Sequence, residues 1–222
     1  MDAINQTLGD IARSNPVATR VFLRHRLDFC CRGHRTLDEA CRTSGLDAAD
    51  IAREIEGETA RTGSVASWAD RPLAELADHI EHHYHERLRR DVPALITAAR
   101  RVERVHAGKP AVPTGLASLL EAFWQELEHH MMKEEKILFP MLRQGALGAS
   151  VYAPVKVMQH EHDEHGVVLA EVRARTGNLT IPPGACATWT ALYRGLETLE
   201  AELMEHIHLE NNILFTRAVL SS

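Results

Sequence analysis

Two copies of one motif carry the histidine and glutamate residues whose spacing points to chemistry. Each copy reads His-x3-Glu-x2-Ile-Leu-Phe; the first contains His130 and Glu134, and the second contains His206 and Glu210. Residues four apart on a helix share one face, so each copy predicts an imidazole and a carboxylate side by side. Transition-metal ions bind both kinds of group. The repeat therefore predicts a metal site.

The residues around both motifs support this interpretation. Apolar residues at alternating steps of three and four surround each His–Glu pair, which is the pattern of a helix that packs into a bundle core. A buried carboxylate costs free energy unless another group compensates its charge. A metal cation bound between the motifs would compensate both glutamates.

Four long helices must position these residues. Apolar stripes predict helices over residues of about 73–106, 116–143, 151–172 and 188–219, and no segment has a clear strand pattern. The first and third helices each carry a histidine in the stripe, His85 and His162. Short connections between four helices predict an up-down-up-down bundle made of two similar hairpins, and hence an all-α fold.

The predicted ligands are the histidines and glutamates on these four stripes: His85, His130, Glu134, His162, His206 and Glu210. Four imidazoles and two carboxylates suit a pair of transition-metal ions, iron or manganese, with each glutamate able to bridge them. For any one histidine the alternative is a core residue without a metal. His165 also lies on the third stripe, so its contribution stays open. Four other histidines are expected on helix flanks or at the surface: His82, His83, His129 and His208.

A small helical domain is predicted over residues 1–62, a linker over 63–70 and the bundle over 71–222. Asn15 is expected to cap a helix that starts at Pro16, and Gly33 predicts a turn directly after Cys30 and Cys31. This cysteine pair has two interpretations, buried structural residues or residues with a redox or binding role.

Composition narrows the class of protein. The chain has 222 residues, a formal net charge of −6 and no basic run, which argues against a nucleic-acid binder. It has no signal-peptide pattern at its first residues and no apolar stretch that could span a bilayer, so we expect a cytoplasmic protein that does not enter membranes. The four cysteines have no disulfide-framework spacing, which fits reduced thiols. The oligomeric state, including a homodimer, stays open.

Taken together, the Cys30–Cys31 turn, the linker and the histidine–glutamate array resemble the iron–sulfur cluster repair family, also called repair-of-iron-centres di-iron proteins, over nearly the full length. The resemblance implies an N-terminal Cys-Cys domain and a hemerythrin-like bundle. It implies that the six predicted ligands hold two non-haem iron ions, oxo-bridged and bridged by both glutamates. Glu126 and Glu161, which we expect to support the ligands or line the access path unless they are solvated acids, match acids that the family places near the iron path. Cys30 and Cys31 would contact a client, a thiol or nitric oxide.

The activity implied by this resemblance is repair of iron–sulfur clusters damaged by nitrosative or oxidative stress, through iron release from a labile di-iron site. Damaged iron–sulfur proteins would be the partners, and nitric oxide or oxygen the small ligands. Two alternatives stay open. One is an enzyme or sink that binds nitric oxide and reduces it to nitrous oxide, and the other is a hemerythrin-type sensor of oxygen or nitric oxide.

Overall fold

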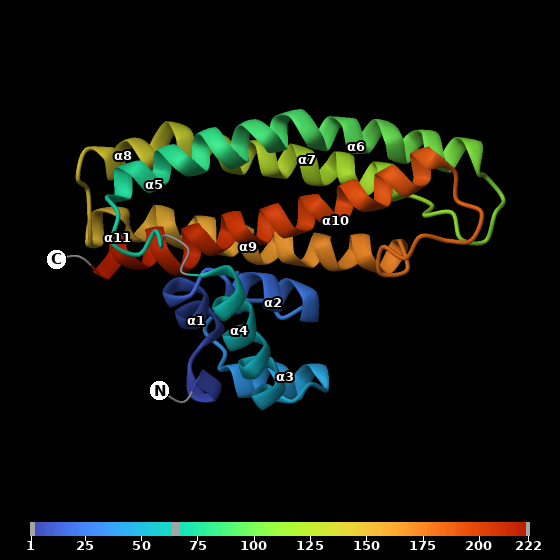
Figure 1. Cartoon of the computed structure of the whole chain (residues 1–222). Coiled ribbons are helices and arrows are strands. Elements are labelled where there is room, and N and C mark those ends of the chain that lie inside the picture. Colours follow the sequence, from blue (N-terminus) through green and yellow to red (C-terminus); the bar gives the residue numbers. More distant parts are fainter. Residues whose placement is uncertain (1–2, 64–66, 221–222) are drawn as a thin grey trace. The chain divides into compact units, whose positions relative to one another are not determined.

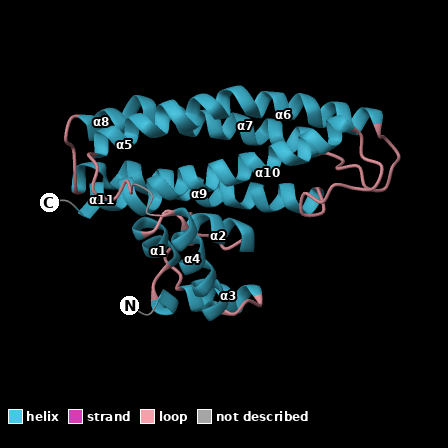
Figure 2. Ribbon diagram, viewed as in Figure 1, coloured by secondary structure: helices cyan, strands magenta, loops and turns pink. Residues whose placement is uncertain are grey.

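Helices form the regular structure of this protein. A computed structural model describes residues 3–63 and 67–220, and within these two ranges it contains helices and loops but no β-strand (Figures 1 and 2). None of the helices in the described ranges is both long and apolar enough to cross a membrane. The predicted all-α fold is confirmed. Residues 64–66 of the predicted linker lie outside the described ranges.

The chain divides into two compact units. Unit 1 comprises the described residues of Met1–Ala77, Leu142–Tyr152 and Met204–Ser222, and unit 2 comprises Asp78–Met141 and Ala153–Leu203. The end of the last long helix therefore belongs with the N-terminal helices. The domain limits inferred from the sequence, 1–62, 63–70 and 71–222, stay a prediction.

Four α-helices and one short 3-10 helix begin unit 1. They are η1 (Ala3–Asn5), α1 (Leu8–Ser14), α2 (Ala18–His25), α3 (Leu37–Ser44) and α4 (Ala48–Thr62). Local capping fixes their starts: Thr36 and Glu39 form a reciprocal capping box at α3, and the Asp47 carboxylate accepts hydrogen bonds from the first turn of α4. These caps satisfy backbone N–H groups that a helix leaves without partners.

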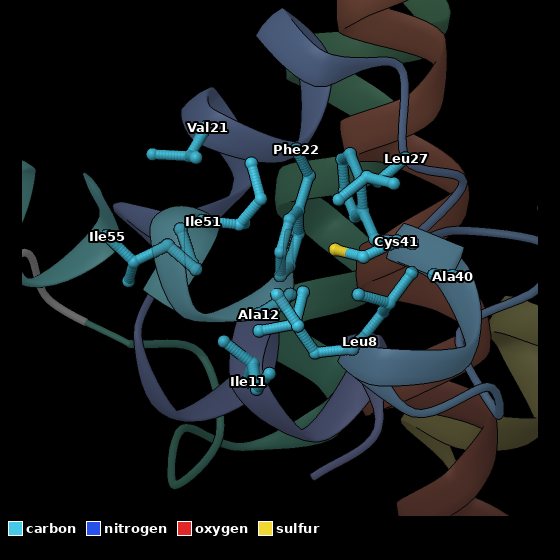
Figure 3. Packing of buried hydrophobic residues seen from close by; sticks show 14 residues of the cluster. Leu8, Ile11, Ala12, Val21, Phe22, Leu27, Ala40, Cys41, Ile51 and Ile55 are labelled. Carbon is cyan, nitrogen blue, oxygen red and sulfur yellow. The ribbon is translucent and has the colours of Figure 1, made fainter. Parts of the chain in front are cut away.

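Apolar side chains from these helices meet in one core, which Figure 3 shows from close by. Phe22 is fully buried there, and its ring centroid lies 5.8 Å from that of Phe29. Each buried side chain of this size contributes about 1.5–3 kcal/mol to folding. The core includes Leu8, Ile11, Val21, Leu27, Cys41, Ile51 and Ile55.

Four long helical stretches supply unit 2, although their residues 73–77, 142–143, 149–152 and 204–220 belong to unit 1. The first consists of α5 (Leu73–His79), the π-helical segment η2 (Ile80–His85) and α6 (Glu86–Val105), and the second of α7 (Leu116–Lys133), the π-helical segment η3 (Glu134–Leu138) and α8 (Phe139–Arg143). The third is α9 (Ala149–Arg175). The fourth consists of α10 (Ala187–His208), the π-helical segment η4 (Leu209–Phe215) and α11 (Thr216–Leu220).

Ion pairs between neighbouring helices of unit 2 close a ring: α6 with α7, α7 with α9, α9 with α10, and α10 with α6. The pairs are Arg89–Glu128, Lys133–Glu161, Arg173–Glu200 and Arg87–Glu202. These pairs are partly exposed and add only modest stability, but they identify which helices are neighbours. Along α6, later residues contact earlier residues of α7, as the second pair Arg100–Glu121 shows, so these two helices are antiparallel. The predicted four-helix bundle is confirmed.

Candidate metal centre

Two π-helical segments place the first ligand candidates. In η2 the Glu86 N–H donates to the carbonyl of Glu81, and in η3 the Phe139 N–H donates to the carbonyl of Glu134, a step of five residues in both. Such π-helical turns are rare and often occur at functional sites, because the extra residue re-aims the side chains of one turn. His85 ends η2 and Glu134 begins η3.

Unit 2 brings four of the six predicted ligands together. His85, Glu134 and His162 are completely buried and His130 is 1% exposed. Glu134 Oε2 lies 3.4 Å from Nε2 of His130 and 3.5 Å from Nε2 of His85. His162 Nε2 lies 3.0 Å from His130 Nε2, and donor atoms of His130, Glu134 and His162 all lie within 4.8 Å of one another.

Two carboxylates orient the imidazoles of His85 and His130 by contacting their second ring nitrogen, Nδ1. His85 Nδ1 lies 2.8 Å from Glu135 Oε1, and His130 Nδ1 lies 2.9 Å from Glu161 Oε2. With each Nδ1–H donated to a carboxylate, each Nε2 keeps a lone pair directed into the core. This arrangement is typical of metal-binding histidines, whose second nitrogen is held by a carboxylate.

Cations in turn hold these two carboxylates. Arg89 donates bidentate hydrogen bonds of 2.8 and 3.0 Å to the Glu135 carboxylate, and Lys133 forms an ion pair with Glu161. Burial raises the pKa of Glu135, but hydrogen bonds from His85 and Arg89 outweigh this effect and lower the pKa to about 2. The hydrogen bond from His130, opposed by burial and aided by Lys133, lowers the pKa of Glu161 to about 2. Both groups are therefore anionic at neutral pH.

The donor set of unit 2 fits a metal ion. Both oxygens of Glu134 are buried and accept no hydrogen bond from the described residues, although two imidazole nitrogens lie close by. Separations of 3.4–3.5 Å are too long for a good N–H···O bond. Two ligand atoms that each lie about 2.1 Å from one ion, with an angle of about 90° at the ion, are roughly 3 Å apart. The separation of 3.0 Å between Nε2 of His130 and Nε2 of His162 matches this value. A cation is the compensating group that this carboxylate lacks.

The other two predicted ligands lie in unit 1. His206 is 1% exposed and Glu210 is completely buried, and Nε2 of His206 lies 2.9 Å from Oε1 of Glu210. His206 lies in the last turns of α10 and Glu210 in η4, so the His-x3-Glu pair shares one helical face as its spacing predicts. Assignment of all six residues to one centre stays a prediction.

Three further histidine and glutamate residues need separate comment. His165 is 3% exposed and presents its ring edge-on to His130 at 4.9 Å, but its nitrogens are not among the donor groups described above. Glu126 lies at the surface of α7, whereas Glu161 directly contacts His130. The expectation that His208 lies at the surface is wrong: it is 4% exposed, packs on Phe29 at 5.5 Å, and burial lowers its pKa to about 4.

Within unit 1, side chains of η4 hold the Cys30–Cys31 turn. The Asn211 Nδ2–H donates to the carbonyl of Cys30 at 3.1 Å, and the Asn212 Nδ2–H donates to the carbonyl of Phe29 at 2.8 Å. A methyl group on Gly33 would lie 2.7 Å from the Phe29 carbonyl and 2.8 Å from Asn212 Oδ1, so only glycine allows this close packing. The turn is thereby fastened to the helical segment that contains Glu210.

The two cysteines of this turn differ in their surroundings. Their sulfur atoms are 3.5 Å apart, and Cys30 is buried whereas Cys31 is partly exposed. The hydrogen bond with Cys31, burial and the nearby Asp28 raise the pKa of Cys30 well above its ordinary value. Cys30 is therefore a neutral thiol at neutral pH.

Sequence reasoning missed Glu135, Arg89 and the two asparagines. Glu135 directly follows a predicted ligand, and a carboxylate beside a ligand is a weak signal that an orienting group is present. The asparagines stand where the first motif has Glu135 and Lys136, and this difference between otherwise matching copies was the available signal.

Comparisons with known proteins agree with this geometry. Residues 76–218 match the hemerythrin HHE cation binding domain, and residues 4–59 match ScdA_N, a domain of unknown function (DUF542). The chain is 46% identical over 215 residues to an iron-sulfur cluster repair protein YtfE of Citrobacter koseri and 47% identical to that of Escherichia coli O81, with 97% of both chains covered in each case. A cation-binding domain of this type and the buried histidine–glutamate groups indicate iron binding. The chain therefore belongs to the family of iron–sulfur cluster repair proteins that join an ScdA_N domain to a hemerythrin-type domain.

Proposed function

We propose that this protein repairs iron–sulfur clusters damaged by nitrosative or oxidative stress, and that it does so by donating iron from a non-haem di-iron centre. The names and near-complete coverage of its relatives support the first part. The donor chemistry of the bundle supports the second, since buried imidazole and carboxylate groups suit ferrous iron.

The proposed ligands are the six residues of the sequence pattern: His85, His130, Glu134, His162, His206 and Glu210. The matched hemerythrin-type domain extends over all six. In this proposal the two glutamates bridge the irons, together with an oxo group. When bound, the irons supply both the cargo for repair and a place for nitric oxide or oxygen to bind.

One observation carries the proposal: Glu134 is completely buried, its oxygens accept no hydrogen bond from the described residues, and two carboxylate-backed imidazoles face it. An arrangement made only for packing would place an apolar residue at this position, because an uncompensated buried carboxylate destabilises the fold. The position is instead suited to a bridging ligand.

The same donors suit release as well as binding. Imidazole and carboxylate groups hold ferrous iron less tightly than thiolates do, and a protonated or shifted carboxylate lowers the affinity further. Glu135 and Glu161 keep His85 and His130 oriented throughout, because each carboxylate is itself anchored by a cation. The chain would thus retain an ordered, empty site after iron transfer.

We assign the client-facing step to the cysteine turn. Cys31 is the more exposed of the two thiols, and Asn211 holds the turn against the segment that contains Glu210. Contact of a client, a thiol or nitric oxide with Cys30 and Cys31 would then occur next to the helix that supplies two of the ligands. Glu126 and Glu161 are proposed as acids along the iron path.

The test is iron transfer under anaerobic conditions. Iron-loaded protein is mixed with a purified [4Fe–4S] enzyme whose cluster nitric oxide has damaged, and iron in both proteins and client activity are followed. We expect client activity to return in proportion to the iron lost. Sustained nitrous oxide production with a reductant, without loss of iron, would instead identify a nitric oxide reductase. Iron that stays bound while the client stays inactive would contradict the proposal.

A further inference from the structure

A cysteine and a histidine outside the candidate metal centre lie within hydrogen-bond distance in unit 2. His106 Nε2 is 3.1 Å from Cys186 Sγ. Cys186 directly precedes α10, since the Thr190 N–H donates to its carbonyl at 2.9 Å, and it is exposed. His106 closes α6, where its own N–H donates to the carbonyl of Val102. The two helix ends therefore pair a nucleophile with a base.

Packing fixes the base in position. His106 is only 7% exposed, and its ring centroid lies 4.9 Å from the ring of Trp189, which is itself 2% exposed. The imidazole therefore keeps its Nε2 atom directed at the sulfur, whereas Cys186 as a residue is exposed. A nucleophile, a base within reach and a third group that orients the base are the parts that activate a side chain for covalent chemistry.

The buried cysteines have the opposite character. Burial raises the pKa of Cys41, and the hydrogen bond to Cys31 together with burial raises that of Cys30. Both are therefore held as thiols away from solvent. Cys186 combines exposure with a base at 3.1 Å and a position at the amino end of a long helix.

We propose that Cys186 and His106 form a site of thiol–disulfide exchange, at which a low-molecular-weight disulfide reversibly modifies Cys186. His106 accepts the thiol proton, and the sulfur anion attacks one sulfur of the disulfide. A bond forms between Cys186 and that sulfur as the disulfide bond breaks, and the leaving thiolate takes the proton from His106. The disulfide is the oxidant, and one free thiol is released for each protein adduct.

The experiment uses the full-length protein and glutathione disulfide as the probe, with peptide mass spectrometry to follow each cysteine. We expect the Cys186 adduct to form well before any adduct of Cys41, and dithiothreitol to remove it. His106→Gln should slow the reaction at Cys186 by about tenfold or more. The control, His160→Gln, changes an exposed histidine that pairs with Glu164 and should react as the unchanged protein does.

A second measurement does not depend on the folding of any variant. The rate of adduct formation at Cys186 is compared between the native protein and the same protein unfolded in guanidinium chloride at equal pH, where His106 is no longer beside the sulfur. We expect the native rate to be about tenfold higher or more. Equal rates in the two states, or a His106→Gln protein that reacts as fast as the unchanged one, would each overturn the proposal.

Discussion

Replacing Glu134 by leucine should change stability in opposite directions with and without iron. Without a metal, the buried carboxylate has no hydrogen bond from the described residues, and an unsatisfied buried polar group costs about 1–3 kcal/mol. Leucine has a similar volume and no polar atom, and volume-conserving changes cost less than about 1.5 kcal/mol. The metal-free Glu134→Leu protein should therefore be the more stable one, by up to about 3 kcal/mol.

With iron the order should reverse. A ligand that binds only the folded state adds about 2.7 kcal/mol when its free concentration is 100 times its dissociation constant. The unchanged protein should gain this stability, whereas the leucine variant loses a proposed bridge and should gain little. For a chain of this length, 1 kcal/mol corresponds to a shift in Tm of about 2–4 °C.

The assay is calorimetry of both proteins, prepared metal-free with a chelator and then reloaded anaerobically with ferrous iron, combined with iron analysis. Glu197→Leu is the matched control, because Glu197 lies exposed on α10; its stability should change by less than about 0.5 kcal/mol and its iron content should not change. If the metal-free Glu134→Leu protein is less stable than the unchanged chain, or if the variant keeps its full iron content after reloading, Glu134 is not a metal ligand.

Three further predictions concern Glu135 and the Cys30–Cys31 turn. Glu135→Gln should lower iron affinity about 10–100-fold in a chelator competition, because His85 loses its carboxylate partner; unchanged affinity would exclude this role. Gly33→Ala should destabilise the protein by about 1–3 kcal/mol in denaturant unfolding, whereas Gly57→Ala, with open space around it, should stabilise it by about 0.5–1 kcal/mol; equal effects would contradict the packing argument. Changing Cys30 and Cys31 to alanine should leave the iron content intact and abolish client repair, so undiminished repair by this double variant would rule out the proposed cysteine role.

The sequence predicted the parts of the fold that depend on periodicity. Apolar stripes located the four long helices within a few residues, because each stripe must face the bundle core. The spacing of four between His206 and Glu210 correctly predicted that they share a face. These properties follow from local geometry alone.

Properties that depend on packing between helices were not predictable in this way. A reading with a constant helical period cannot locate η2, η3 and η4, where an extra residue per turn shifts the side chains that follow. His208 was expected at the surface because no local signal shows that Phe29 covers it. Asn15 was expected to begin a helix, but it closes α1, and its side chain accepts from the Val17 N–H before α2 begins.

The contact between Glu135 and His85 could not be predicted either, because it also depends on packing between helices. The two residues lie on different helices, and their approach depends on the register of α6 against α7. Sequence spacing gives the face of each helix but not this register. For the same reason the sequence named donors on four helices and Glu161 as a supporting acid, while the contact of Glu135 with His85 emerged only from the packed bundle.

A di-iron centre in this chain is tested by the metal content of the anaerobically purified protein, together with an absorption spectrum before and after nitric oxide. We expect about two irons per chain and the spectrum of an oxo-bridged pair that nitric oxide alters. A metal-free protein, or one that binds zinc and does not respond to nitric oxide, would contradict this expectation. In that case the buried histidine and glutamate groups would be a polar core without a role in iron chemistry.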